Sequence, residues 1–244
     1  MIPKKIHYCW LSDDPFPEKI RRCIDSWKEK LPDYEIIRWD LQRFPLEKCN
    51  WVRQAYETKK YAFAADYIRL YALATEGGIY LDSDVEVLKS FDDLLDYPYF
   101  ICKENSPQGI EAATIGAESG CEWIGKCLDY YKDKNFINEK GEQNNRVLPS
   151  IIKEVITHNY TLHEVVSPID IVRDKENVYM LPSDYFSPKN YVSKKLRLTP
   201  NTYSIHHFAG TWQPQWKKIL LRIWVPLSVK YPFITNSIKY LWKG

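Results

Sequence analysis

Two carboxylates stand two positions apart directly after a short apolar segment. Asp82 and Asp84 follow residues 79–81, which are predicted to form a buried strand behind the helix-ending pair Gly77-Gly78. Two carboxylates at a strand end can both reach one hard divalent cation, one directly and one through water. Such a cation would offset the repulsion between a carboxylate and a diphosphate, about 4 kcal/mol at about 4 Å and an effective dielectric constant of about 20. The spacing predicts a site where a metal stabilises a departing phosphate, and a solvated turn is the alternative.

A second polar pair lies on the helix that is predicted before this strand. Asp66 and Arg69 are three residues apart in the otherwise apolar stretch 61–76, so their side chains share one helix face. In the functional interpretation Asp66 accepts hydrogen bonds from sugar hydroxyls and Arg69 neutralises a phosphate. The alternative is a local ion pair of little energetic value.

Histidine, hydroxyl and aromatic residues near the two ends of the chain are further candidates. His206 and His207 precede Thr211 and Trp212, and a late histidine could return to the metal as a third protein ligand. A nitrogen ligand among oxygens would favour Mn²⁺ over Mg²⁺. Thr211 and Trp212 could donate hydrogen bonds to a phosphate oxygen. Trp10, at the end of the first predicted strand, could stack on a nucleobase, and core packing is the alternative for Trp10 and for the histidines.

The predicted elements place these residues at the edge of a parallel sheet. A strand at 5–10, a helix at 17–31 and a strand at 34–39 form a βαβ unit. Open α/β sheets bind ligands at the carboxyl ends of their strands, where Asp82 and Asp84 stand. The remaining expected elements are strands at 98–102 and 205–208 and helices at 121–131 and 147–158.

The composition agrees with one α/β domain. The chain has 244 residues, 45% of them hydrophobic, and a formal net charge of +2, so wholesale disorder is not expected. No apolar run approaches about 18 residues and no signal peptide is recognised at the N-terminus, so no membrane span is expected. The six cysteines lack metal-site spacing, and we expect free thiols in a reducing cytoplasm.

The C-terminal part of the chain is strongly basic. Residues 185–244 contain ten Lys and Arg and no Asp or Glu, while the rest of the chain has an excess of acidic groups. We expect a boundary near Gln213, with residues 1–212 as the main domain and 213–244 as a short basic extension of amphipathic helices. Two interpretations are open for this extension: a solvated face packed on the main domain, or peripheral attachment to an anionic membrane. Nucleic acid is not an expected partner, because the aromatic residues lie on the apolar stripe.

The motifs together resemble one known family. Residues 65–73 followed by 77–84 closely resemble the sugar-binding Asp-x-Asp region of glycosyltransferase family 32, which includes bacterial capsule and lipopolysaccharide transferases and yeast mannosyltransferases. The opening 2–10 and the closing 206–212 are similar too, so the resemblance covers about residues 1–215. It implies a GT-A-type, Rossmann-like single domain with a mixed, mainly parallel sheet, a divalent cation, and a retaining transferase that uses a nucleotide sugar.

The resemblance, which extends to the clostridial glucosylating toxins, also implies roles for individual residues. It implies that Trp10 stacks on the base and that Tyr80 lies behind the nucleotide. Asp66 and Arg69 would hold the donor sugar and phosphate, and Asp82 would contact ribose and sugar hydroxyls. Asp84 and His207 would ligate the metal, with His206 as the alternative ligand. Thr211 stands where the toxins carry Ser.

The expected function is therefore that of a hexosyltransferase. It would move a sugar from a nucleotide sugar, with uracil favoured over guanine, to a surface polysaccharide or oligosaccharide of the capsular or lipopolysaccharide type, at the cytoplasmic side of the cell membrane. A haloacid-dehalogenase-type phosphatase is an alternative, although Glu86 stands where that motif carries Thr or Val. A metal-dependent carbohydrate-binding module is another, but it gives no reason for Asp66 and Arg69. No nucleophile is evident, so front-face attack and double displacement both stay open.

Overall fold

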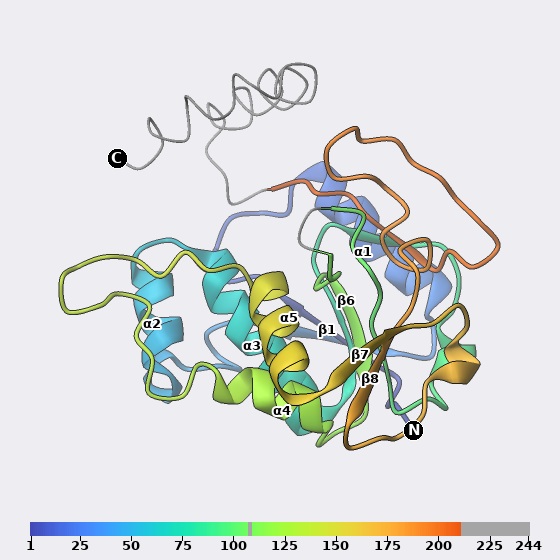
Figure 1. Ribbon diagram of the computed structural model, residues 1–244. Helices are drawn as coiled ribbons and strands as arrows, with labels where there is room; N and C mark the ends of the chain where they lie inside the picture. The colour runs from blue at the N-terminus through green and yellow to red at the C-terminus, as the bar shows by residue number, and fades with distance from the viewer. Residues whose placement is uncertain (107–108, 211–244) are drawn as a thin grey trace, which may run out of the picture.

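A five-stranded sheet forms the centre of the protein. The computed structural model describes residues 1–106 and 109–210, and the sheet has the order β2-β1-β3-β6-β5 (Figure 1). Its strands are β2 (Glu35–Trp39), β1 (Lys5–Cys9), β3 (Gly78–Leu81), β6 (Thr114–Ala117) and β5 (Tyr99–Phe100). β1 is parallel to both β2 and β3, whereas β6 is antiparallel to both of its neighbours. The predicted βαβ opening and the mixed, mainly parallel sheet are therefore confirmed.

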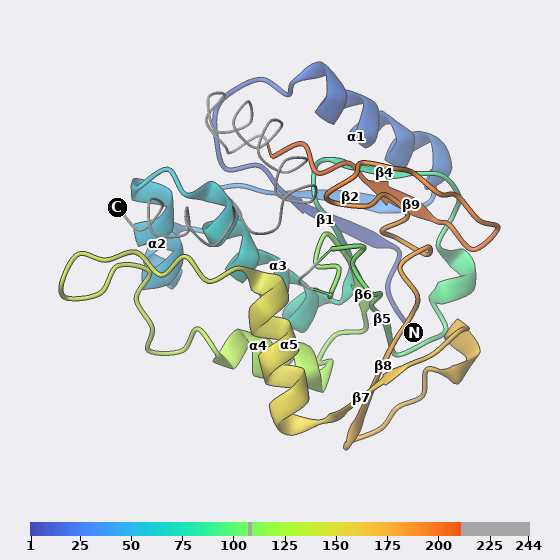
Figure 2. The ribbon, with the colours of Figure 1, turned by 45° about the horizontal axis from the view of Figure 1, so that its top comes forward.

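Helices cover both faces of this sheet. α1 (Glu18–Lys30) lies on one face, and α3 (Tyr61–Glu76) lies on the opposite face with α2 (Asn50–Glu57), α4 (Glu122–Asp129) and α5 (Leu148–Asn159) around it (Figure 2). Tyr8 of β1 packs against Trp27 of α1 with ring centres 5.4 Å apart, and Trp39 of β2 packs against Tyr71 of α3 at 6.0 Å. The apolar faces of the helices thus cover both faces of the sheet and form a hydrophobic core on each side.

Two short ribbons and three 3₁₀ turns complete the described part of the chain. β4 (Val85–Val87) pairs antiparallel with β9 (Ser204–His206), and β7 (Thr161–Glu164) pairs parallel with β8 (Asn177–Met180). The 3₁₀ turns span Leu46–Lys48, Asp92–Leu94 and Pro168–Asp170. The β4–β9 pairing matters most for function, because it brings the segment after β3 beside a segment more than 100 residues later.

The predictions for the end of the chain lie outside the described residues. These are the domain boundary near Gln213, the basic helices over 213–244, and the side chains of Thr211 and Trp212. Among the residues that are described, none of the helices combines the length and apolar character needed to cross a membrane.

The junction between α3 and β3 depends on two glycines. Gly77 ends α3 with φ +65°, and its N–H donates to the carbonyl oxygen of Leu73 at 3.1 Å. A Cβ on Gly77 would lie 2.5 Å from the backbone nitrogen of Ser119, and one on Gly78 would lie 2.8 Å from the carbonyl oxygen of Lys5. Only residues without a side chain therefore let the chain turn sharply from α3 into the centre of the sheet.

We predict that Gly77→Ala lowers the free energy of unfolding by about 2 kcal/mol or more, because it adds backbone strain and a clash with fixed backbone. Gly125→Ala is the matched control, since nothing lies within 4 Å of its Cβ position inside α4. It should stabilise the protein by about 0.5–1 kcal/mol through helix propensity. Urea unfolding followed by circular dichroism measures both, and equal effects of the two substitutions would contradict this account of the junction.

Candidate functional site

The Asp-Ser-Asp segment forms a tight turn between β3 and β4. The N–H of Asp82 donates to the carbonyl oxygen of Ala113 at 2.9 Å, and the N–H of Val85 donates to the carbonyl oxygen of Asp82 at 2.9 Å. The Oδ2 atom of Asp84 accepts a hydrogen bond from the N–H of Ala209 at 2.6 Å. Backbone contacts from two distant segments thus fix both carboxylates at the carboxyl end of β3.

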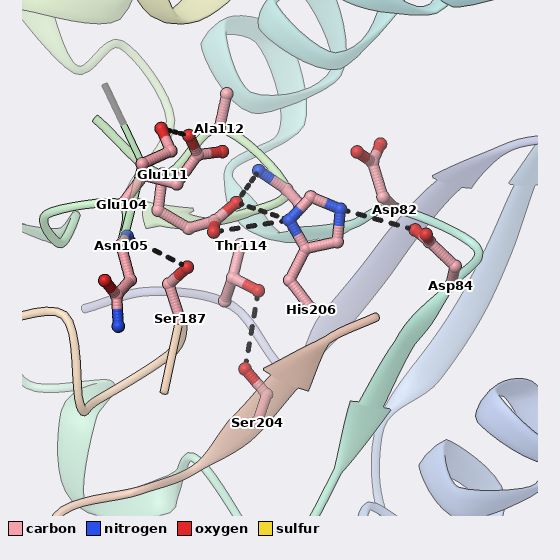
Figure 3. A network of polar contacts seen from close by, with 12 residues as sticks. Asp82, Asp84, Glu104, Asn105, Glu111, Ala112, Thr114, Ser187, Ser204 and His206 are labelled. Carbon is pink, nitrogen blue, oxygen red and sulfur yellow. Dashed lines mark hydrogen bonds and ion pairs between the residues drawn. The ribbon is translucent and has the colours of Figure 1, made fainter. Parts of the chain in front are cut away.

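An imidazole from β9 completes a group of possible metal ligands. Val85 pairs with His206 in the β4–β9 ribbon, and the Nε2 atom of His206 lies 3.6 Å from Oδ1 of Asp84 (Figure 3). One ligand atom each from Asp82, Asp84 and His206 lies within 4.8 Å of the other two. Two carboxylate oxygens and one imidazole nitrogen suit a divalent cation, and the nitrogen suits Mn²⁺ better than Mg²⁺.

The structure separates the two adjacent histidines. His206 is the last residue of β9, and His207 follows it outside the strand. The Nε2 atom of His207 lies 2.7 Å from Oε2 of Glu86 in β4. His207 was the metal ligand expected from the resemblance, and the described geometry brings the alternative, His206, to the carboxylates instead.

A buried carboxylate stands behind His206. Glu111 has no exposed surface, and its Oε1 atom accepts a hydrogen bond from the N–H of Ala113 at 2.7 Å. The Nδ1 atom of His206 lies 3.2 and 3.3 Å from the two carboxylate oxygens of Glu111 (Figure 3). A proton on Nδ1 is therefore held by Glu111, and Nε2 is left to face Asp84 as a ligand.

The electrostatics of this cluster favour a cation. Burial lowers the pKa of His206, but Glu111 and Asp84 raise it, and the balance is a pKa of about 10. Burial, with Glu111 adding to it, raises the pKa of Glu104 to about 8. Glu104, Glu111 and His206 form a second group of close ligand atoms next to the first. The clustered carboxylates thus favour the binding of positive charge, either a proton or a metal ion.

Arg69 joins the α3 pair to the first carboxylate of the turn. Its Nη2 atom lies 3.1 Å from Oδ1 of Asp66 and 3.0 Å from Oδ1 of Asp82, and Nη1 donates to the carbonyl oxygen of Ala112. Its guanidinium also lies 4.5 Å from the centre of the Tyr80 ring. The side chain is only 6% exposed and its Nε atom has no hydrogen-bond partner. Arg69 therefore fixes the positions of Asp66 and Asp82, whatever it binds in addition.

Burial also changes the acidity of the two carboxyls that flank Arg69. It raises the pKa of Asp66 to about 7, with Arg69 opposing the change. It raises the pKa of Asp82 as well, again against the effect of Arg69. Near neutral pH, Asp66 can therefore either donate or accept a hydrogen bond, which suits the hydroxyl groups of a sugar.

The two aromatic candidates lie at different depths. Trp10 is half-buried, packs edge-on against Phe16 at 4.8 Å, and donates from Nε1 to the carbonyl oxygen of Asp14 at 2.9 Å. Tyr80 is 1% exposed and lies beneath Arg69, so it supports the site from below.

Sequence reasoning missed Glu104 and Glu111. Both stand in an irregular stretch without hydrophobic periodicity or a recognisable motif, so only the folded chain places them beside His206. Glu111 is fully buried, which marks it as a residue with a specific partner.

We predict that Glu111→Gln weakens Mn²⁺ binding about 10- to 100-fold, because the carboxylate that orients His206 is lost. Glu86→Gln is the matched control, since it alters the partner of His207. Calorimetric titration with Mn²⁺ alone compares the two variants with the parent protein. Weaker binding in Glu86→Gln together with unchanged binding in Glu111→Gln would identify His207 as the ligand and contradict the prediction.

Comparisons with known proteins support the interpretation of this region. Residues 17–101 match the family described as the glycosyltransferase sugar-binding region containing DXD motif. Inositol phosphoceramide mannosyltransferase 3 of Schizosaccharomyces pombe is 34% identical over 123 residues, which are 49% of this chain and 34% of the relative. Mannosyl phosphorylinositol ceramide synthase SUR1 of Saccharomyces cerevisiae is 32% identical over 124 residues, covering 48% of this chain and 31% of the relative. The chain thus spans about a third of the length of these relatives.

A solved structure supports the fold. The PaToxG glycosyltransferase superposes with a TM-score of 0.50 at 24% identity, covering 64% of this chain and 68% of that one. This likeness concerns the fold alone, and it agrees with the GT-A-type domain that the sequence predicts. Residues 17–101 match the DXD-containing sugar-binding region of glycosyltransferases, and the resemblance recognised in the sequence is confirmed for this part of the chain.

Proposed function

We propose that the protein is a metal-dependent, retaining glycosyltransferase that moves a hexose from a nucleotide sugar to a glycan or lipid-linked glycan. The observation that carries this proposal is the convergence of Asp82, Asp84 and His206, with Arg69 tying Asp82 to Asp66 immediately behind them. A bound divalent cation would neutralise the donor diphosphate and stabilise the departing phosphate. Retention is part of the proposal because the family resemblance implies it.

Individual residues have separate roles in the proposed binding of the cation and the donor. Asp84 and His206 would hold the cation, and Arg69 fixes the position of Asp82 beside them. Asp66, with a pKa of about 7, is suited to hydrogen bonding with donor sugar hydroxyls. Trp10 offers an aromatic face for the base at the end of β1.

The identity of the sugar and of the nucleotide is a finer part of the proposal. A UDP-linked donor follows from the resemblance to the glucosylating toxins. The names of the yeast relatives refer to mannosyl transfer, so mannose belongs in the panel of sugars to be tested. The acceptor would be a surface polysaccharide or oligosaccharide of the capsular or lipopolysaccharide type.

We predict that UDP binds in the presence of Mn²⁺ with an affinity at least about tenfold higher than in EDTA, and that Asp84→Ala removes this difference. GDP is titrated in parallel as the alternative nucleotide. Isothermal calorimetry on the full chain measures the four combinations, and NMR of the sugar product gives its anomeric configuration.

The outcomes separate the proposed transferase from its alternatives. Absence of metal-dependent binding for both nucleotides would refute the donor site. Covalent phosphorylation of Asp82 would indicate a phosphatase instead.

We also propose that the protein acts at the inner face of the cell membrane, held there by the basic residues of 213–244. The sequence of this segment supports the proposal: it contains Lys and Arg, aromatic residues, and no Asp or Glu.

We predict that the full chain co-sediments with vesicles containing anionic lipid, and that 0.5 M salt, about three times the physiological level, reduces this recovery severalfold by screening. Neutral phosphatidylcholine vesicles are the control. Equal recovery with both vesicle types, or no recovery with either, would refute attachment through the basic segment.

A further inference from the structure

Two lysines lie close to the candidate metal ligands without an ion pair to a carboxylate. Lys189 donates from Nζ to the carbonyl oxygen of His207 at 3.5 Å. The Nζ atom of Lys194 lies 4.5 Å from the centre of the Tyr191 ring and 5.2 Å from that of Phe208. Within residues 1–106 and 109–210, neither of these two ammonium groups has an ion pair with a carboxylate.

The charges of these lysines act on one another. Burial lowers the pKa of Lys189 and Lys19 lowers it further, with Asp84 as an opposing carboxylate. Burial also lowers the pKa of Lys194, followed by the effects of Lys189 and Lys19. The sequence after Asp184 contains no Asp or Glu, so the C-terminal part of the chain has no acidic side chain that could neutralise them. A bound anion would relieve this repulsion.

The lysines approach the candidate metal ligands from a different element than Arg69, which belongs to α3. The segment between β8 and β9, which carries Lys189 and Lys194, passes next to α1 in both ribbon views (Figures 1 and 2). The N–H of His207 donates to the carbonyl oxygen of Asp84 at 3.1 Å. Lys189 is therefore linked to the Asp-Ser-Asp turn through one residue, whereas Asp66 and Arg69 reach that turn from α3.

Two aromatic rings adjoin the ammonium groups. Tyr191 and Phe208 pack edge-to-face with ring centres 5.1 Å apart, and Phe208 also packs on His206 at 4.0 Å. Tyr191 is 39% exposed. Exposed aromatic carbon beside fixed positive charge suits a ligand that combines a sugar ring with an anionic group.

We propose that Lys189 and Lys194 form a phosphate subsite for the acceptor, with Tyr191 and Phe208 against its sugar ring. This inference rests on the proposed glycosyltransferase function, and it makes the acceptor a sugar that carries a phosphate or phosphodiester group. The donor diphosphate is assigned to the cation at Asp82, Asp84 and His206, so the two phosphate-binding regions are distinct.

The test uses the full chain saturated with UDP and Mn²⁺, so that the donor site is occupied. Calorimetry compares three hexose phosphates (mannose 6-phosphate, glucose 6-phosphate and glucose 1-phosphate) with mannose, glucose and inorganic phosphate. The double variant Lys189→Gln/Lys194→Gln is compared with Lys195→Gln, which removes an exposed positive charge from the same segment. We expect at least one hexose phosphate to bind more tightly than its parent sugar and than inorganic phosphate.

In the double variant this hexose phosphate should bind at least about tenfold more weakly, as the loss of hydrogen bonds to charged groups implies. Lys195→Gln should bind it as the parent protein does, and the affinity for UDP with Mn²⁺ should be unchanged in both variants. A loss of UDP affinity in the double variant would assign the lysines to the donor diphosphate and overturn the proposal. So would hexose phosphates that bind no better than their parent sugars.

The experiment distinguishes failure of this inference from failure of the proposed glycosyltransferase function. In that case UDP and Mn²⁺ would not bind to the parent protein at all, whereas the comparison of hexose phosphate with hexose can still be made without nucleotide.

Discussion

The antiparallel pairing of β4 with β9 is the constraint on which the site depends. It places Val85 opposite His206 and thereby joins the turn after β3 to a segment near the end of the described chain. The turn alone supplies two carboxylates that repel each other and the phosphates of a donor. The paired strand adds an imidazole, and Ala209, shortly after the strand, donates its backbone N–H to Asp84. The ribbon therefore converts a common sequence pattern into a specific arrangement of ligands.

Buried charge in the site is balanced by a small number of cations. Arg69 is shared by Asp66 and Asp82, while His206 lies between Glu111 and Asp84. Each partner would be strongly destabilising if it were left alone in a buried environment. The arrangement consequently fixes side-chain geometry before any donor arrives, which is the main contribution of a protein to binding charged substrates.

Much of the fold could be predicted from local sequence, and the reason is periodicity. The apolar stretch that ends at Gly77 gave the limits of α3, and the βαβ opening followed from alternating and helical patterns. The elements that were not predicted are short: α2 has eight residues, and β6 and β7 have four each. Local pattern therefore identified the long periodic elements and missed several short ones, including the fully buried β6.

Within the candidate site, the sequence predicted only the residues that belong to recognisable motifs. Asp82, Asp84, Asp66 and Arg69 stand in recognisable spacing, and the structure brings all four together. The choice between two adjacent histidines depends on strand register, which a single sequence does not specify. Glu111 depends on tertiary packing alone, so it could not be found before the structure.

Positive charge reaches the Asp-Ser-Asp turn from two separate sides of the sequence, α3 and the segment between β8 and β9. From α3, Arg69 is shared by two carboxylates and contacts Asp82. From the segment between β8 and β9, Lys189, which has no ion pair with a carboxylate in the described residues, adjoins the same turn through His207. A transferase must hold two substrates on either side of one reacting carbon, and a sugar donor with its cation needs only one of these sides. The unneutralised side is therefore available to a second anionic substrate, and its charge would disfavour acceptors that carry positive groups.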